Sequence, residues 1–184
     1  MPLKLERGNL LISYPYLEDD YFYRSVICMI EHNNEGSFGL IINKKMPYKI
    51  GEVLPILAHL DNPIYMGGPV DTQSIFFFHP YKDLKDALYV SDGLYMNGDS
   101  TELKDMLELD FAKPQELRFY LGYAGWSVDQ LEVEIKEKSW LIGTPNSALV
   151  FDDSPDEMVW RKSVEMLGDE YKDLAHFPID PQMN

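Results

Sequence analysis

Residues 25–43 read SVICMIEHNNEGSFGLIIN, and this stretch decides the fold. Ser25–Glu31 is an almost continuous apolar run, which is typical of a strand that is covered on both faces. Asn33-Asn34-Glu35-Gly36 has the composition of a turn, and the chain then becomes apolar again over Phe38–Asn43. The stretch therefore predicts a β-hairpin whose first strand is buried.

Other strands are expected on both sides of this hairpin. They are Asn9–Ser13, Pro63–Met66, Ser74–His79, Ala87–Val90 and Leu117–Leu121. Between them, Pro55 limits Ile50–Leu60 to a short or broken helix. Asp92-Gly93 and Asn97-Gly98 bracket Leu94–Met96 and indicate turns.

Helices are expected later in the chain. Asp99 and Glu102 form a capping pair for a helix that ends near Leu109. Ser127 with Gln130 predicts a second helix, with Val128, Leu131 and Ile135 on one face. Ser154-Pro155-Asp156-Glu157 predicts a third, with Trp160, Val164 and Leu167 as its apolar stripe and Gly168 at its end. Strands early and helices late favour an α+β fold.

Length and composition indicate one domain over residues 1–184. The chain has 45% hydrophobic and 26% charged residues, which is ordinary for a globular protein. Its single cysteine, Cys28, excludes an internal disulfide, and its mid-strand position predicts a buried, inert thiol. Leu10–Ile12 is too short for the core of a signal peptide, and no run reaches membrane-helix length. We expect a cytoplasmic protein with no membrane contact.

The charge is strongly acidic and uneven. The formal net charge is −15, divided as −1 over residues 1–60, −6 over 61–120 and −8 over 121–184. The only basic cluster is Lys44-Lys45 with Lys49 nearby, which is too few cations for strong phosphate binding. We therefore expect no direct binding to duplex DNA.

Sequence signatures of cofactor and metal sites are absent. The chain has no Walker loop, no dinucleotide-binding glycine fingerprint, no zinc-binding His-Glu-x-x-His and no serine elbow. Its four histidines, His32, His59, His79 and His176, are far apart in the sequence. We predict no cofactor, no metal and no catalytic residue.

Glu31-His32-Asn33 is the most suggestive group, at the end of the first hairpin strand. A carboxylate, an imidazole and an amide suit acid–base work, but adjacent residues on a strand point to opposite faces. The other interpretation is that Asn33 closes the turn while Glu31 and His32 bind backbone amides around it. A triad of Ser25, His32 and Asp92 is a weaker possibility, because Ser25 has no elbow geometry.

Two glycine-containing segments are also candidates. Gly67-Gly68-Pro69 either exposes backbone N–H groups to an anion or simply permits a tight turn, and we favour the turn. Leu121–Trp126 leads into the helix expected after Ser127, and Trp126 there either fills the core or forms a pocket wall.

These motifs together resemble the AlgH/YqgE family. The resemblance is carried by Phe22–Ile27, Glu31-His32-Asn33, Gly39–Asn43, Gly67–Val70, Ser91-Asp92, Leu121–Trp126, Gln130-Leu131-Glu132, Trp140-Leu141 and Trp160-Arg161, in that order. It covers about residues 8–168, whereas the tail, 169–184, is divergent. Many family members have cysteine directly before the Glu-His-Asn triplet, where this chain has Ile30.

The resemblance implies a single compact α+β domain with a folded, partly bifurcated and mostly antiparallel sheet flanked by helices. It also implies a bacterial cytoplasmic protein, labelled as a transcriptional regulator, with no assigned reaction.

Three functions are open at this point. The favoured one is a non-enzymatic binding or regulatory protein, a monomer or weak oligomer, whose partner is a small molecule or a protein. Its predicted site consists of Arg24, Ser25, Glu31, His32, Asn33, Gly67, Gly68 and Trp126, with Arg24 as the anchor for an anionic group. The second is a hydrolase-like enzyme that uses His32 with Glu31. The third is a purely structural or interaction protein, in which all of these motifs are turns that specify the fold.

Overall fold

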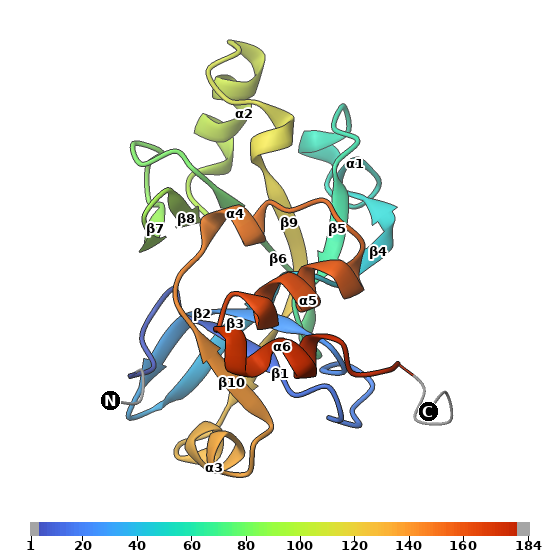
Figure 1. Cartoon of the computed structure of the whole chain (residues 1–184). Coiled ribbons are helices and arrows are strands. Elements are labelled where there is room, and N and C mark those ends of the chain that lie inside the picture. The colour runs from blue at the N-terminus through green and yellow to red at the C-terminus, as the bar shows by residue number, and fades with distance from the viewer. Residues whose placement is uncertain (1–3, 180–184) are drawn as a thin grey trace.

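The hairpin lies inside the sheet of a computed structural model that describes residues 4–179 (Figure 1). Its strands are β2 (Val26–Asn33) and β3 (Gly36–Ile41), which pair antiparallel from Ile27–Ile41 to Asn33–Gly36. Val26 to Ile30 are all buried, as expected for a strand that is covered on both faces. The hairpin prediction is confirmed.

The described residues form one ten-stranded sheet with the order β10-β1-β2-β3-β9-β6-β8-β7, to which β4 and β5 add a branch. The other strands are β1 (Leu10–Ser13), β4 (Lys45–Lys49), β5 (Pro63–Met66), β6 (Val70–His79), β7 (Leu88–Ser91), β8 (Leu94–Met96), β9 (Arg118–Trp126) and β10 (Trp140–Gly143). All pairs are antiparallel except β5 with β9. The expected α+β fold with a branched, mostly antiparallel sheet is confirmed.

The branch point is β9, because three strands pair with it. Its end pairs with β3, and Phe119 to Leu121 lie between β5 on one side and β6 on the other. Gly122, with a φ of +68°, lies where β9 passes from β5 to β3. β9 thereby holds the hairpin and β6 in one sheet.

The described residues contain six α-helices and three short 3-10 turns. The helices are α1 (Ile50–Val53), α2 (Ser100–Glu108), α3 (Gln130–Lys136), α4 (Ser147–Val150), α5 (Asp156–Glu165) and α6 (Lys172–Ala175), and the 3-10 turns are η1 (Pro55–Leu57), η2 (Pro114–Glu116) and η3 (Asp169–Tyr171). Asp99 caps α2 as predicted, and α1 with η1 is the broken helix that Pro55 imposes. None of these helices has the length and apolar character needed to cross a membrane.

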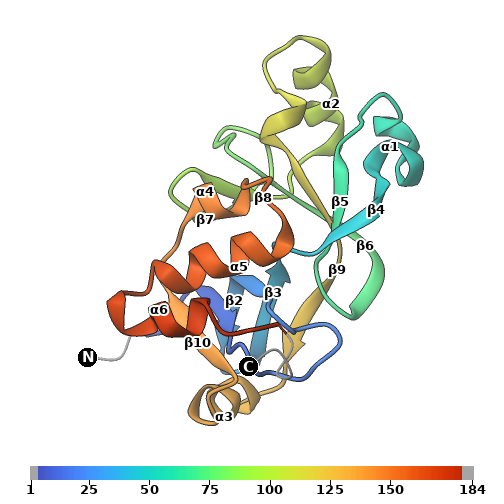
Figure 2. The same cartoon turned by 45° about the vertical axis from the view of Figure 1, so that its right-hand side comes forward.

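The two faces of the sheet are covered differently. On one face, α5 and α6 lie over the sheet (Figure 2). Their residues Trp160, Val164 and Ala175 belong to one buried core with residues of β1 and β2. On the other face, Trp126, Leu131 and Trp140 pack against Ile27 and Met29; Leu131 comes from α3. Cys28 is fully buried in the first of these cores, as predicted.

The structure corrects several boundaries. β9 continues to Trp126, since its small residues lie in the strand rather than in a loop. α3 begins at Gln130 after Asp129, whose φ is +63°, so Ser127 is not its cap and Val128 is exposed. The cap of α5 is Pro155, not Ser154. The strands β4, β8 and β10 and helix α4 were not predicted. Of the divergent tail, residues 169–179 form η3, α6 and their continuation, and residues 180–184 lie outside the described part.

Candidate functional site

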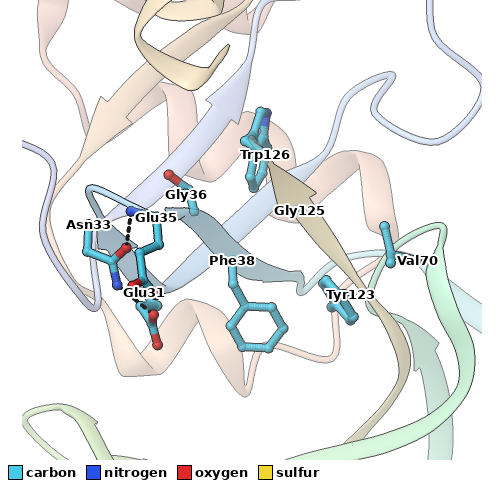
Figure 3. Close-up of a pocket in the computed structure, with 10 residues that line it drawn as sticks. Glu31, Asn33, Glu35, Gly36, Phe38, Val70, Tyr123, Gly125 and Trp126 are labelled. Atoms are coloured by element: carbon cyan, nitrogen blue, oxygen red, sulfur yellow. Dashed lines mark hydrogen bonds between the residues drawn. The ribbon is translucent and has the colours of Figure 1, made fainter. Parts of the chain in front are cut away.

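An open pocket of about 530 Å³ lies at the turn of the β2–β3 hairpin (Figure 3). The hairpin forms one side, and the end of β9 with the start of β6 forms the other. We call it the hairpin pocket. Its lining residues are Glu31, Asn33, Glu35, Gly36, Ser37, Phe38, Val70, Tyr123, Gly125 and Trp126. It brings together Glu31, Asn33 and Trp126 of the predicted site.

A bulge in the hairpin sets which side chains enter this pocket. The β2–β3 register shifts by one residue between Met29 and Glu31, so that Glu31 pairs with Phe38 and His32 with Ser37. Because paired residues share a face of the sheet, Glu31 lies on the face of Phe38. An added residue in one strand turns the following side chains to new faces. The bulge thus places a carboxylate beside an aromatic ring.

The turn holds the acidic side of the pocket in place. The Asn33 side-chain Nδ2 donates to Glu31 Oε1 (2.7 Å), and the Asn33 side-chain Oδ1 accepts from the Glu35 backbone N–H (2.8 Å). In Figure 3 these three residues lie together on one side of the pocket. Asn33 therefore closes the turn, as one of the two interpretations expected, and it also orients the Glu31 carboxylate. The other part of that interpretation is not met, because among the residues that the structure describes Glu31 and His32 contact side chains and not backbone amides.

Aromatic rings form the other part of the pocket. The Phe38 and Tyr123 rings meet edge to face with 4.9 Å between centroids, and Phe76 packs against both. Gly125 is paired with Phe38 across the strands and has no side chain, so it leaves space beside the Phe38 ring. Val70, with 38% of its surface exposed, extends the apolar wall. The pocket is apolar at its floor and acidic at its rim.

The acidic rim has no internal cation. Glu31 and Glu35 are exposed, and within residues 4–179 no lysine, arginine or histidine side chain forms an ion pair with either carboxylate. The same range contains no group of three or more His, Cys, Asp or Glu residues suited to a metal ion. The rim is therefore free to attract a positive group from outside.

His32 lies on the opposite face from Glu31. Its Nδ1 is 2.8 Å from Ser37 Oγ, and its Nε2 is 3.4 Å from Glu132 Oε1 on α3. The strand alternation predicted this separation. The acid–base pair of His32 with Glu31 is consequently not formed, since the Glu31 carboxylate accepts from Asn33 instead.

Arg24 and Ser25 lie away from the hairpin pocket and are buried. The Arg24 guanidinium pairs with Glu157, donates to the carbonyl oxygens of Phe177 (2.6 Å) and Pro178 (3.1 Å), and lies 4.5 Å from the Trp160 ring centroid. The expectation that Arg24 anchors an external anion is corrected by this burial. Its Nη1 group is bound to Glu157 of α5, and its Nη2 group donates to the C-terminal segment.

Gly67 and Gly68 are buried against β9. A Cβ atom at Gly67 would collide with the backbone of Gly122, and one at Gly68 with the backbone of Tyr123. Neither residue lines the hairpin pocket. Their absence of side chains permits the chain to pass close to β9 between β5 and β6, so these glycines are needed for a close backbone approach.

Trp126 is 6% exposed and belongs both to the core and to the pocket lining. Its indole N–H donates to Glu134 Oε2 (2.9 Å).

Four pocket residues, Glu35, Phe38, Val70 and Tyr123, were not predicted from the sequence. The alternation of side chains along a strand could have placed Phe38 with Leu40, and Tyr123 with Leu121, on one face each. Only the β3–β9 pairing, however, brings the Phe38 and Tyr123 rings together.

Comparison with known proteins gives one family. A sequence model described as AlgH-like matches residues 10–172. A UPF0301 protein of Bacteroides thetaiotaomicron is 38% identical and one of Chlorobaculum tepidum 41% identical; the alignments cover 97% and 98% of this chain and 91% and 96% of those proteins.

Solved structures agree. The AlgH protein of Pseudomonas aeruginosa superposes with a TM-score of 0.70 at 30% identity, covering 90% of this chain and 93% of that one. A Corynebacterium diphtheriae protein has the same fold, with a TM-score of 0.78 at 21% identity over 96% of this chain and 95% of that one. On the family match and the identity of these relatives, the chain belongs to the AlgH-like family.

Proposed function

We propose that this chain is a non-enzymatic binding protein that receives a basic segment of a partner protein in the hairpin pocket. The observation that carries the proposal is the joint presence of two unpaired carboxylates, Glu31 and Glu35, and an aromatic floor in one open pocket. A lysine or arginine side chain matches both parts, because its charge meets the rim and its stem or guanidinium plane packs on the rings.

A macromolecular partner suits this pocket better than an enclosed small molecule. The pocket is open to solvent, whereas sites for small ligands bury most of the ligand surface. A net charge of −15 adds long-range attraction for a basic partner and speeds its encounter. We place this binding in the cytoplasm, where the family resemblance points.

The regulatory role that the resemblance implies would then be indirect. Duplex DNA carries one negative charge per ~1.7 Å of axis, and an acidic protein is repelled by it. We expect no complex with labelled mixed-sequence duplex at ~150 mM salt. A micromolar or tighter complex that weakens steeply with added salt would refute the indirect mechanism.

The direct test measures the binding of two short peptides by calorimetry or fluorescence anisotropy. Acetyl-Lys-Phe-Lys-amide is the basic probe, and acetyl-Glu-Phe-Glu-amide has the opposite charge and the same ring. We expect only the basic peptide to bind. In the double variant Glu31→Gln/Glu35→Gln its affinity should fall roughly two- to thirtyfold, since each exposed pair contributes about 0.2–1 kcal/mol and two pairs are lost.

The matched control is Glu165→Gln/Glu170→Gln, which removes two exposed charges outside the pocket. We expect this variant to bind the basic peptide as the unmodified protein does. Equal losses in both double variants would show attraction by net charge alone and refute the site. Loss of binding in Phe38→Leu, with unchanged stability, would support the aromatic floor.

A further inference from the structure

A second recess of about 310 Å³ lies beside α3, which is at the bottom of Figure 1, where the segment before β2 meets the ends of β9 and β10. We call it the tryptophan recess. Its lining residues are Leu17, Asp19, Phe22, Gly125, Trp126, Gln130, Glu134, Ser139 and Trp140. It contains no basic residue, and except for Gly125 and Trp126 it is separate from the hairpin pocket.

Three aromatic rings meet in this recess. Trp126 and Trp140 are nearly perpendicular, with 6.0 Å between centroids, and Phe22 lies edge to face with Trp140 at 5.5 Å and stacked with Trp126 at 6.3 Å. Aromatic faces attract cations through their quadrupole, most strongly for tryptophan. The rings give the recess an apolar aromatic wall, in which Phe22 is partly exposed and Trp126 and Trp140 present only the 6% and 3% of their surface that is not buried.

Glu134 is the charged group of this wall. Its Oε2 accepts both indole N–H groups, from Trp126 at 2.9 Å and from Trp140 at 2.8 Å. Its Oε1 accepts the Gln130 amide at 2.9 Å. All three donors are neutral, so they fix the carboxylate in place without cancelling its charge.

Asp19 adds a second carboxylate, which accepts the backbone N–H groups of Tyr21 and Phe22. In the part of the chain that the structure describes, neither Asp19 nor Glu134 forms an ion pair with a lysine, arginine or histidine. The recess therefore combines two negative charges with aromatic walls and no internal counter-ion.

The hydrogen bonds of Glu134 also restrict the kind of cation. A carboxylate has about four acceptor positions, and three are occupied by the two indoles and Gln130. A primary ammonium or a guanidinium brings three or five donors that need acceptors. A fully alkylated ammonium brings none and needs only charge and apolar contact, as in aromatic cages.

We propose that the tryptophan recess binds an N-alkylated ammonium group, either in a free quaternary amine or on a methylated lysine of a protein. This goes beyond the hairpin-pocket function and does not depend on it, because the charged groups of the two sites are different residues. The Glu134 charge stabilises the ammonium, and the Phe22, Trp126 and Trp140 side chains contact its methyl groups.

The test is an NMR titration of the three indole N–H signals. Choline is the probe, its neutral carbon isostere 3,3-dimethylbutan-1-ol tests the charge, and ammonium chloride tests the alkyl groups. We expect choline alone to shift the Trp126 and Trp140 signals, with Kd on the order of 1 mM for so small a ligand. Trp160 is the internal control, since it does not line the recess and its indole donates to Ser13 O (2.9 Å).

Glu134→Gln keeps an acceptor oxygen but removes the charge, and it should weaken choline binding roughly tenfold. Its matched control is Glu137→Gln, an exposed charge at the end of the same helix that does not line the recess. Phe22→Leu should also weaken binding, and it keeps the test informative if Glu134→Gln does not fold. Glu31→Gln/Glu35→Gln should leave choline binding unchanged, which separates this site from the hairpin pocket.

A second arm compares choline with acetyl-trimethyllysine-amide. Tighter binding of the lysine derivative assigns a protein ligand, and tighter binding of choline assigns a free amine. Equal binding of choline and its neutral isostere, an unchanged affinity in both Glu134→Gln and Phe22→Leu, or no shift with any alkylammonium would each overturn the proposal.

Discussion

Replacing Arg24 with alanine separates a structural arginine from a ligand anchor. The guanidinium is 1% exposed, pairs with Glu157, donates to two carbonyl oxygens of the C-terminal segment and packs on the Trp160 ring. Removing one partner of a buried ion pair typically costs ~3–5 kcal/mol. In this variant Glu157 still forms its ion pair with Arg161 at 3.0 Å, and its side chain is 30% exposed. The Glu157 charge is therefore neither unpaired nor fully buried. We expect a loss of about 3–4 kcal/mol, which includes the unpaired carbonyl groups.

Urea unfolding followed by circular dichroism measures this loss, with the unfolding slope unchanged between variants. Thermal unfolding should shift downward by roughly 6–16 °C, at ~2–4 °C per kcal/mol for a chain of this size. Arg161→Ala is the control, because it touches the same Glu157 carboxylate from a side chain that is 40% exposed. It should cost less than ~1 kcal/mol.

The expected binding result is equally specific. Arg24→Ala that remains folded should bind the basic peptide and choline as the unmodified protein does, since Arg24 lines neither the hairpin pocket nor the tryptophan recess. A stability loss below ~1 kcal/mol, together with weaker binding, would refute the structural role and restore Arg24 as an anchor.

Three further outcomes are expected. Burial raises the pKa of Cys28 to about 12, so the thiol should react slowly with an aromatic disulfide reagent in the native protein and fast in urea; rapid native labelling would contradict its burial. Gly68→Ala would press a Cβ atom against the Tyr123 backbone and should lower the free energy of unfolding, measured in urea, by about 2–3 kcal/mol. An unchanged free energy would mean that the backbone around Gly68 and Tyr123 moves apart to admit the methyl group. Partial burial raises the pKa of the Asp152 carboxyl, but hydrogen bonds from Lys162 and Ser154 outweigh this effect and lower the pKa to about 2. Its contribution to stability is thus complete above the unfolded pKa of ~4 and lost as pH falls toward 2; Asp152→Asn should lower stability at neutral pH and flatten that acid-side loss, and an unchanged pH profile would contradict it.

The hairpin could be predicted from the sequence because its signals are local. The apolar run from Val26 to Ile30 and the turn residues that follow it are contiguous, and both strands form as expected. The strand β10 (Trp140–Gly143) could not be recognised in this way. It has four residues, and it is a strand because it pairs with β1, more than a hundred positions earlier.

The candidate site was only partly predictable for the same reason. Glu31 and Asn33 were selected from the turn, and strand alternation correctly separated Glu31 from His32. Tyr123 reaches the pocket through strand pairing that no local pattern specifies. Arg24 was misjudged because its partner, Glu157, lies 133 residues away along the chain.

The position of β9 as the shared neighbour of three strands has a consequence for synthesis on the ribosome. Ile64 of β5 pairs with Phe119 of β9, which is synthesised 55 residues later, so β5 cannot form this pairing until then. At ~5–20 residues per second this takes roughly 3–11 s. During that interval the run Phe76-Phe77-Phe78 of β6 also lacks β9, and of these three residues β8 pairs only with Phe78. We therefore expect newly made chains to expose an unpaired aromatic edge, which is the kind of edge that favours aggregation. A product released before Arg118 keeps the β9-facing edges of both β5 and β6 unpaired, so residues 118–126 complete the sheet on two sides at once.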